Sequence, residues 1–123
     1  NNRSRGLGDV YKRQRIYCAG ALGKYYEKLG GKVTYYGKPY PEIYDFVMND
    51  LLSKDTTIKK EILAIGDSLK TDCLGAHKSD LDFLFIKNGI HKTEIANDDD
   101  LVRISKANLP ETCKTLMYTE ILN

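Results

Sequence analysis

The stretch that decides the fold is Glu61-Ile62-Leu63-Ala64-Ile65-Gly66-Asp67-Ser68-Leu69-Lys70-Thr71-Asp72. Its first half is a short apolar run that predicts a buried strand over Ile62–Ile65, and Gly66-Asp67 ends this run abruptly. The carboxylates of Asp67 and Asp72 are five residues apart, where the strand opens into a loop and a following helix. Because ligands of open α/β sheets bind at the carboxyl ends of the strands, we expect a binding site here.

A lysine occupies the equivalent position after an earlier apolar segment. Lys32–Tyr36 is rich in β-branched and aromatic residues and is predicted to be a strand, which Gly37-Lys38-Pro39 ends. Parallel strands with right-handed crossovers have their carboxyl ends at one edge, so Lys38 and Asp67 are expected there together. Carboxylate oxygens suit Mg²⁺, which also takes phosphate oxygens, and an ammonium suits a phosphoryl group. The pattern indicates chemistry on a phosphorylated substrate.

The candidate site residues suggest different roles. Asp67, directly at the strand end, is expected to be a direct metal ligand. Asp72, in the first turn of the next helix, is expected either to hold metal-bound water or to pair with Lys38 and fix its position. Ser68, with backbone N–H groups near the helix start, would add hydrogen-bond donors for an anion. Each residue alone is an ordinary structural residue, and only their joint placement favours a site.

Strands and helices are predicted to alternate along the chain. The predicted helices cover Ile16–Leu29, Pro41–Ser53 and Thr71–Lys78, and Asp98-Asp99-Asp100 marks the start of another, where acids complement the helix dipole. Two further strands are predicted over Asp82–Lys87 and Met117–Leu122. This alternation indicates an α/β fold with a Rossmann-like parallel sheet and helices on both faces.

Length and composition suit one small globular domain. The chain has 123 residues, of which 41% are hydrophobic and 29% charged. No apolar run reaches the roughly 20 residues needed to span a membrane, and the N-terminus lacks the apolar region of a signal peptide. Cys18, Cys73 and Cys113 show no Cys-x-x-Cys spacing, so they predict neither a zinc site nor a disulfide framework. We expect reduced thiols in a cytoplasmic protein.

The first fourteen residues are expected to be foreign to the fold. Ser4–Gln14 is similar to the conceptual translation of a transposon-type sequencing adaptor, and such segments are excluded from fold reasoning. We therefore predict that residues 1–14 are disordered and that the natural reading frame continues upstream of Arg15. Their four basic residues and one acidic residue give a net charge of +3, so without them the chain changes from +2 to −1. The composition then gives no support to nucleic-acid binding.

Two motifs resemble those of a known family. Gly37-Lys38-Pro39 resembles motif III, and Gly66–Asp72 resembles motif IV, of the haloacid dehalogenase-like (HAD) hydrolases. The flanking sequence over about residues 16–95 is similar to class IIA, the 4-nitrophenylphosphatase-like phosphatases. The resemblance implies a Rossmann-like core that uses Mg²⁺ to hydrolyse a small phosphomonoester through an aspartyl-phosphate. It also implies that Lys38 and Asp72 are catalytic, that Lys38 and Ser68 bind phosphate, and that Asp67 and Asp72 serve the metal.

Other parts of the family pattern are missing from the sequence. The Asp-x-Asp nucleophile motif, the motif II Ser/Thr and the substrate-selecting cap domain have no counterpart at the expected places. We therefore expect residues 15–123 to be the C-terminal part of a HAD-like core that is inactive alone and whose parent acts on a small phosphorylated metabolite, not on nucleic acid or a membrane. A non-catalytic phosphate- or metal-binding module on the same fold remains the alternative.

Two rival activities and two histidines offer other interpretations of the sequence. A phosphoacceptor receiver domain also combines acids, a lysine and Mg²⁺, but its lysine follows the acids, whereas Lys38 precedes them. Dehalogenation is the weaker option within the resembled superfamily, because the acid pair favours phosphoryl transfer. His77 is expected to be a surface or packing residue, and His91, in a loop nearer the active edge, is a weak candidate for a general base.

Overall fold

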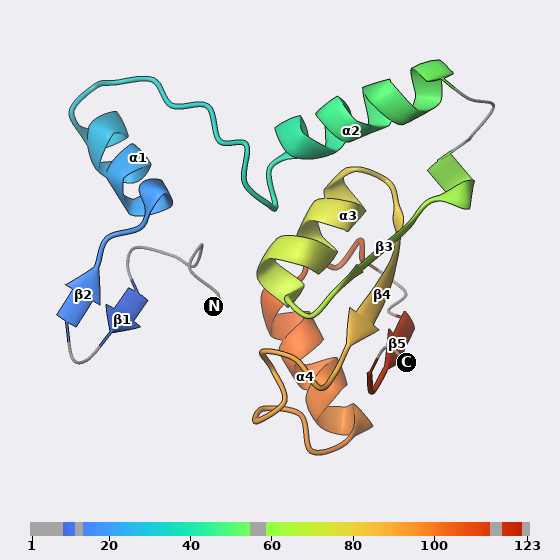
Figure 1. Cartoon of the computed structure of the whole chain (residues 1–123). Coiled ribbons are helices and arrows are strands. Elements are labelled where there is room, and N and C mark those ends of the chain that lie inside the picture. The colour runs from blue at the N-terminus through green and yellow to red at the C-terminus, as the bar shows by residue number, and fades with distance from the viewer. Residues whose placement is uncertain (1–8, 12–13, 55–58, 114–116, 122–123) are drawn as a thin grey trace. The chain divides into compact units, whose positions relative to one another are not determined.

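The computed structural model describes residues 9–11, 14–54, 59–113 and 117–121. The chain divides into two compact units, Asn1–Gly37 and Lys38–Asn123, and each is described by itself (Figure 1). No helix among the described residues is both long enough and apolar enough to cross a membrane.

The first unit contains a short hairpin followed by a helix. Strand β1 (Asp9–Tyr11) pairs antiparallel with β2 (Gln14–Ile16), and α1 (Ala19–Lys28) follows. Residues 9–11, which belong to the segment predicted to be disordered, pair with β2, and the prediction for residues 1–14 as a whole stays a prediction. Residues 1–8 and 12–13 of the same predicted segment lie outside the described residues. The predicted end of α1 is confirmed, since Gly30 follows it with a φ of 88°.

The strand predicted over Lys32–Tyr36 is not formed, which corrects the sequence-based expectation. Its side chains alternate between half-buried and exposed, as in a strand, but no partner strand is found for it in the described parts of the chain. Tyr35 instead packs against Gly23 of α1 and donates a hydrogen bond to Glu27 (3.0 Å). The β-branched and aromatic content of this segment predicted a strand, but a ladder depends on a second strand, which local composition does not supply.

The second unit contains the parallel sheet. It consists of β3 (Leu63–Gly66), β4 (Asp82–Ile86) and β5 (Met117–Thr119), in the order β3-β4-β5. Ile65 pairs with Leu84 and Phe85 pairs with Tyr118, both in parallel register. The predicted α/β fold with a parallel sheet is confirmed.

The connections between these strands are helical, as predicted. The 14-residue helix α2 (Pro41–Lys54) and a 3₁₀ turn, η1 (Lys59–Glu61), precede β3. A π-helical turn, η2 (Leu69–Cys73), and α3 (Leu74–Lys78) join β3 to β4, while α4 (Asp98–Asn108) precedes β5. The helix predicted from Thr71 thus begins two residues earlier, at Leu69, because the Cys73 N–H donates to the Ser68 carbonyl (3.0 Å) in an i→i+5 bond.

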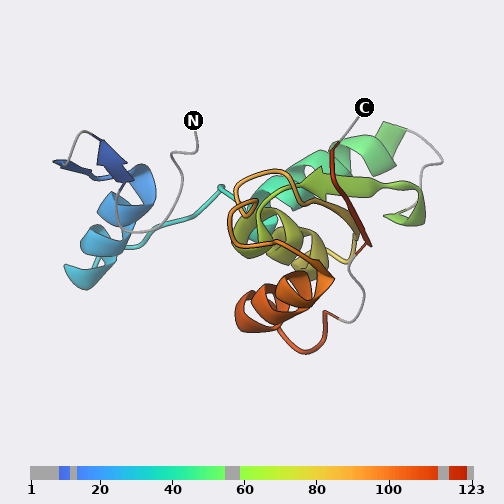
Figure 2. The ribbon, with the colours of Figure 1, turned by 90° about the horizontal axis from the view of Figure 1, so that it is seen from below.

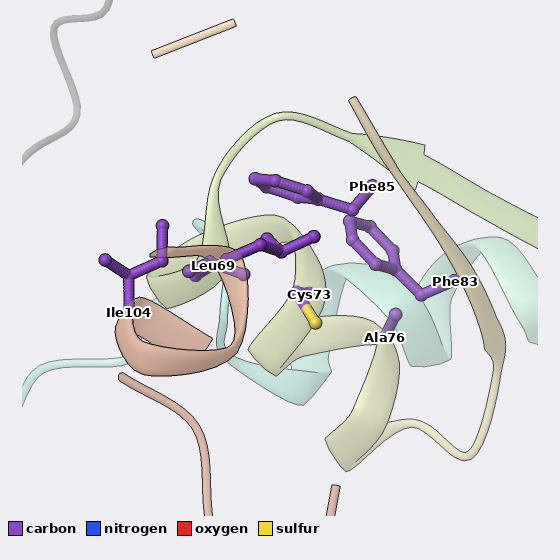
Figure 3. Packing of buried hydrophobic residues seen from close by; sticks show 7 residues of the cluster. Leu69, Cys73, Ala76, Phe83, Phe85 and Ile104 are labelled. Carbon is purple, nitrogen blue, oxygen red and sulfur yellow. The ribbon is translucent and has the colours of Figure 1, made fainter. Parts of the chain in front are cut away.

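The hydrophobic core lies between the sheet and its helices. Phe83 and Phe85 of β4 face η2, α3 and α4, as Figure 3 shows. Phe85 and Leu69 are fully buried, with 0% of their surfaces exposed. The other members of the cluster are Cys73, Ala76, Leu101 and Ile104. This packing fixes the π-helical turn that follows the end of β3.

Helices cover one face of the sheet in the described part of the chain. Ala64 belongs to the same face as Phe83 and Phe85, since these residues pair across β3 and β4 or alternate along β4. Helices α3 and α4 lie on the same side of the strands in Figure 2. On the opposite face, Leu63 and Ile65 remain 46% and 47% exposed. Helices were expected on both faces of the sheet, and the described residues place them on one face.

Candidate active site

An ion pair between Lys38 and Asp72 forms the centre of the candidate site. The Lys38 ammonium contacts Asp72 Oδ1, and the backbone N–H of Ser68 donates to Asp72 Oδ2 (3.1 Å). The side chain of Asp72 is 10% exposed, whereas that of Lys38 is 54% exposed. Asp72 therefore uses both oxygens inside the protein, while the lysine retains donors that face solvent. The second of the two roles expected for Asp72, pairing with Lys38, is the one the geometry shows.

Helix α2 brings Lys38 to Asp72 by packing against α3. Tyr44 of α2 contacts Gly75 so closely that a side-chain carbon at position 75 would overlap the tyrosine ring. The Tyr44 hydroxyl also donates to the Asp72 carbonyl at 3.5 Å. Because Lys38 lies just before the start of α2 at Pro41, this contact between helices determines where the ammonium lies.

Gly66 allows the end of β3 to approach Asp72. A Cβ added to Gly66 would lie 2.5 Å from Asp72 Cβ and 2.6 Å from Oδ2, distances that real side chains do not adopt. The glycine of the Gly-Asp pair is therefore required by close approach of the Asp72 side chain to the strand. The absence of a side chain at Gly66 therefore lets the end of β3 lie close to the ion pair.

Asp67, which directly follows β3, is held by the loop after β4. The backbone N–H of Ile90 donates to Asp67 Oδ2 (3.0 Å), and Gly89 leaves the space that the Asp67 side chain fills. Across the described residues, Asp67 Oδ1 accepts no hydrogen bond. Asp67 is thus a half-buried carboxylate whose Oδ2 is the oxygen engaged by the loop after β4.

The backbone N–H of Ser68 is engaged within the protein. Ser68 is only 7% exposed, and its backbone N–H already donates a hydrogen bond to Asp72. This N–H is therefore not a donor left over for an anion. The structure brings Lys38, Ser68 and Asp72 together, and Ser68 supports the aspartate.

His91 also reaches this loop, more closely than the sequence indicated. Its Nε2 lies 3.5 Å from the backbone N–H of Leu69, and its Nδ1 lies 2.9 Å from Glu94 Oε1. The two contacts are satisfied together when Nδ1 carries the proton and donates to Glu94 while Nε2 accepts. His77, in contrast, lies on α3, and its Nε2 is 3.0 Å from the Thr112 hydroxyl. The sequence placed His91 in a loop nearer the active edge, but its contacts with Leu69 and Glu94 depend on the path of the loop after β4.

Two neutral groups surround the ion pair. Burial, aided by the Asp72 carboxylate, raises the pKa of Tyr44 to about 12. Burial, aided by Cys113 and then by Asp72, raises the pKa of the Cys73 thiol to about 12. Both groups stay protonated at neutral pH and add no charge.

The donor set fits Mg²⁺ through Asp67. The described residues contain no group of three or more His, Cys, Asp or Glu side chains that could hold a metal ion. Mg²⁺ does not need such a group, because it usually keeps several waters and takes one or two carboxylates together with substrate phosphate. The open oxygen of Asp67 suits this role, whereas Asp72 has both oxygens engaged by Lys38 and Ser68.

The chain is similar to known proteins of one family. A family model described as HAD-hydrolase-like matches residues 35–108. A haloacid dehalogenase-like family hydrolase from Brucella suis 1330 is 29% identical with a TM-score of 0.54, and the match covers 91% of this chain and 40% of that one. A double mutant of the thermostable NPPase from Geobacillus stearothermophilus is 27% identical, with a TM-score of 0.57 and coverage of 75% and 36%.

A third solved structure, a possible sugar phosphatase of the HAD superfamily from Cytophaga hutchinsonii, is 26% identical. Its TM-score is 0.55, and the match covers 92% of this chain and 38% of that one. No curated protein matches the chain. The chain therefore spans between 36% and 40% of the length of these solved structures.

The family match includes every residue of the candidate site. Residues 35–108 contain the lysine before α2, the two aspartates after β3 and the loop that holds Asp67. The match also spans more than half of the 123 residues. The chain therefore belongs to the HAD-like hydrolases.

Proposed function

We propose that this chain supplies the phosphate-binding and metal-binding part of a Mg²⁺-dependent phosphatase that acts on a small phosphomonoester. The observation that carries the proposal is the Lys38–Asp72 ion pair beside Asp67 at the carboxyl end of β3. A fixed ammonium and an open carboxylate oxygen are complementary to a phosphate and its metal counter-ion. The family to which the chain belongs supports a hydrolytic reaction.

Lys38 is the residue proposed to contact the phosphoryl group. Asp72 holds the ammonium on one side, and the side chain is still 54% exposed, so N–H donors remain for a ligand oxygen. A lysine of this kind stabilises charge where it develops in a phosphoryl-transfer transition state. Asp72 is proposed as a positioning residue, since its oxygens contact Lys38 and the Ser68 N–H.

Asp67 is proposed to hold Mg²⁺, which when bound neutralises negative charge on the phosphate. The Ile90 N–H fixes Oδ2, and among the described residues Oδ1 accepts no hydrogen bond, which supports its assignment to the metal. The attacking carboxylate, on which an aspartyl-phosphate would form, is proposed to come from sequence outside the 123 residues. We accordingly expect this chain alone to be inactive.

The proposed substrate is a phosphorylated metabolite in the cytoplasm, with no nucleic acid or membrane as partner. Free thiols at Cys18, Cys73 and Cys113 suit that compartment. The competing proposal is a non-catalytic module that binds phosphate or metal on the same fold. The two differ in whether an Asp-x-Asp motif at a strand end accompanies this chain in the complete reading frame.

The decisive experiment is to sequence across the Gln14–Arg15 junction and to assay the complete protein with 4-nitrophenyl phosphate and Mg²⁺. We expect Lys38→Ala to lower kcat/KM by about 10²–10³-fold, the usual effect of losing one charge-stabilising donor. Lys78→Ala, which changes an exposed lysine at the end of α3, is the matched control and should stay within about twofold. Removal of Mg²⁺ with a chelator should abolish turnover.

Two outcomes would contradict the proposal. A complete reading frame without an Asp-x-Asp motif, and without turnover, would leave the non-catalytic module. Turnover of 4-nitrophenyl phosphate by the 123-residue chain above background would overturn the expectation that it is inactive alone.

A further inference from the structure

Two of the three cysteines form a pair behind the candidate site. Cys73, in η2, is 1% exposed and belongs to the hydrophobic core cluster, and Cys113 packs against that cluster from the loop after α4. Both cysteines line the same cavity, and the nearby Cys113 side chain contributes to the raised pKa of the Cys73 thiol. Figure 3 shows the Cys73 sulfur on the turn between Leu69 and Ala76.

The pair lies beside a cavity that an oxidant can enter. A cavity of about 430 Å³ is lined by both cysteines together with His77, Leu81, Phe83 and Met117, among others. Cys113 is half-buried, whereas Cys73 is almost completely enclosed. A hydrogen bond from the Cys113 N–H to the Pro110 carbonyl (2.9 Å) keeps this loop turned toward the core. Cys113 is therefore the thiol that a small solute meets first.

We propose that Cys73 and Cys113 are an oxidative modification site, at which a hydroperoxide converts the two thiols into a reversible disulfide. The proposal does not depend on the phosphatase activity. It does connect the site to oxidation, since Cys73 directly follows Asp72, the partner of Lys38. Oxidation would tie the turn that carries Asp72 to the loop after α4.

The chemistry balances with one hydroperoxide for each pair. The Cys113 thiolate attacks one peroxide oxygen, the O–O bond breaks, and the leaving oxygen takes a proton, which leaves Cys113 as a sulfenic acid. The Cys73 sulfur then attacks the Cys113 sulfur, so that an S–S bond forms while the S–O bond breaks. Cys73 gives up its proton and water leaves. Two thiols are oxidised by two electrons, and hydrogen peroxide is reduced to two waters.

Cys18 provides the contrast within the same chain. It lies in the first unit, immediately before α1, and is also half-buried. No second cysteine shares that unit in the printed sequence. Their shared place beside one cavity, rather than exposure alone, therefore distinguishes Cys73 and Cys113.

The test is peptide mapping of the full chain after treatment with hydrogen peroxide. Remaining thiols are blocked with N-ethylmaleimide, and the protein is digested with trypsin without reductant. We expect peptide Thr71–Lys78 to be linked to Ala107–Lys114, two hydrogen atoms lighter than the two reduced peptides together, and to separate again with dithiothreitol. Peptide Ile16–Lys24, which contains Cys18, should carry the maleimide.

Single-cysteine variants sharpen the result. Cys18→Ser should leave the linked pair unchanged, whereas Cys113→Ser should remove it and leave Cys73 as a thiol. The mapping of the unaltered chain and of Cys18→Ser decides the question even if Cys113→Ser does not fold. A linkage that involves Cys18, oxidation of Cys113 to a sulfinic acid without a linkage, or labelling of all three thiols would each overturn the proposal.

Discussion

The two faces of the three-stranded sheet differ although the same strands form both. Phe83 and Phe85 of β4 lie under η2, α3 and α4, and Phe85 is fully buried. Leu63 and Ile65 of β3 point to the other face, where about half of each surface is exposed. All four residues are apolar, so residue type did not decide which were covered.

The covered face is also the one that builds the candidate site. Gly66 ends β3 on this face and leaves space for Asp72, which lies in a turn anchored by the buried Leu69. The open face contributes no residue to the ion pair. Packing on one face of the sheet and the geometry of the site therefore depend on the same few contacts, and substitutions on the two faces should have unequal effects.

The largest difference in the free energy of unfolding is expected between Phe85→Ala and Ile65→Ala. Loss of the fully buried ring should lower the free energy of unfolding by about 3–5 kcal/mol, because it removes apolar burial and leaves a cavity. Ile65 is 47% exposed, so its truncation should cost about 1 kcal/mol or less. Urea unfolding of the two variants of the full chain measures both values. Equal losses would mean that the open face is covered as well.

A smaller effect is expected from Gly66→Ala. The new methyl group would lie 2.5 Å from Asp72 Cβ, so either the strand end or the turn must move, at a cost of about 1–3 kcal/mol. Gly20→Ala is the matched control, because nothing lies within 4 Å of an added Cβ there and alanine favours a helix. Urea midpoints would compare the two. Unchanged stability in Gly66→Ala would contradict the close approach of Asp72 to β3.

The smallest effect is expected at the rim of the covered face, where polar groups connect α4 to β5. A hydrogen bond from Tyr118, followed by the Lys87 ammonium, holds the pKa of Asp98 below its usual 3.8. Because the pKa is lower in the folded state, this contribution is complete above about pH 4 and is lost as the pH falls through the folded pKa. The thermal midpoint of the chain should therefore fall slightly more in acid than that of Asp98→Asn. Identical acid profiles would contradict this role for Asp98.

Local sequence predicted much of the second unit. Apolar runs bounded by glycine or polar residues gave β3 and β4 to within one or two residues, because a strand buried in a sheet needs such a run. The acidic start of α4 was confirmed, with Asn97 as the cap whose side chain accepts from the Asp100 N–H (3.0 Å). These features depend on neighbours in the sequence.

The remaining features depend on residues far apart in the chain. The strand predicted over Lys32–Tyr36 requires a partner strand, which no local pattern supplies. The hydrogen bond to Asp67 comes from the Ile90 N–H, 23 residues away, and the contact with the Leu69 N–H comes from His91. The choice between two roles for Asp72 likewise required the position of Lys38, which is 34 residues away and set by α2 packing on α3. Local sequence therefore indicated the candidate site residues, whereas their contacts depend on distant parts of the chain.

Strand β3 has a consequence for the handling of this chain at high concentration. In the described residues β3 pairs with β4 alone, so its outer edge presents backbone donors and acceptors without a neighbouring strand. Leu63 and Ile65 add apolar surface beside that edge. An edge of this kind is a template for pairing between copies, and natural proteins protect such edges with charge, proline or bulges. Leu63–Gly66 carries none of these. If copies of the chain associate, β3 is therefore the strand at which we expect them to pair first.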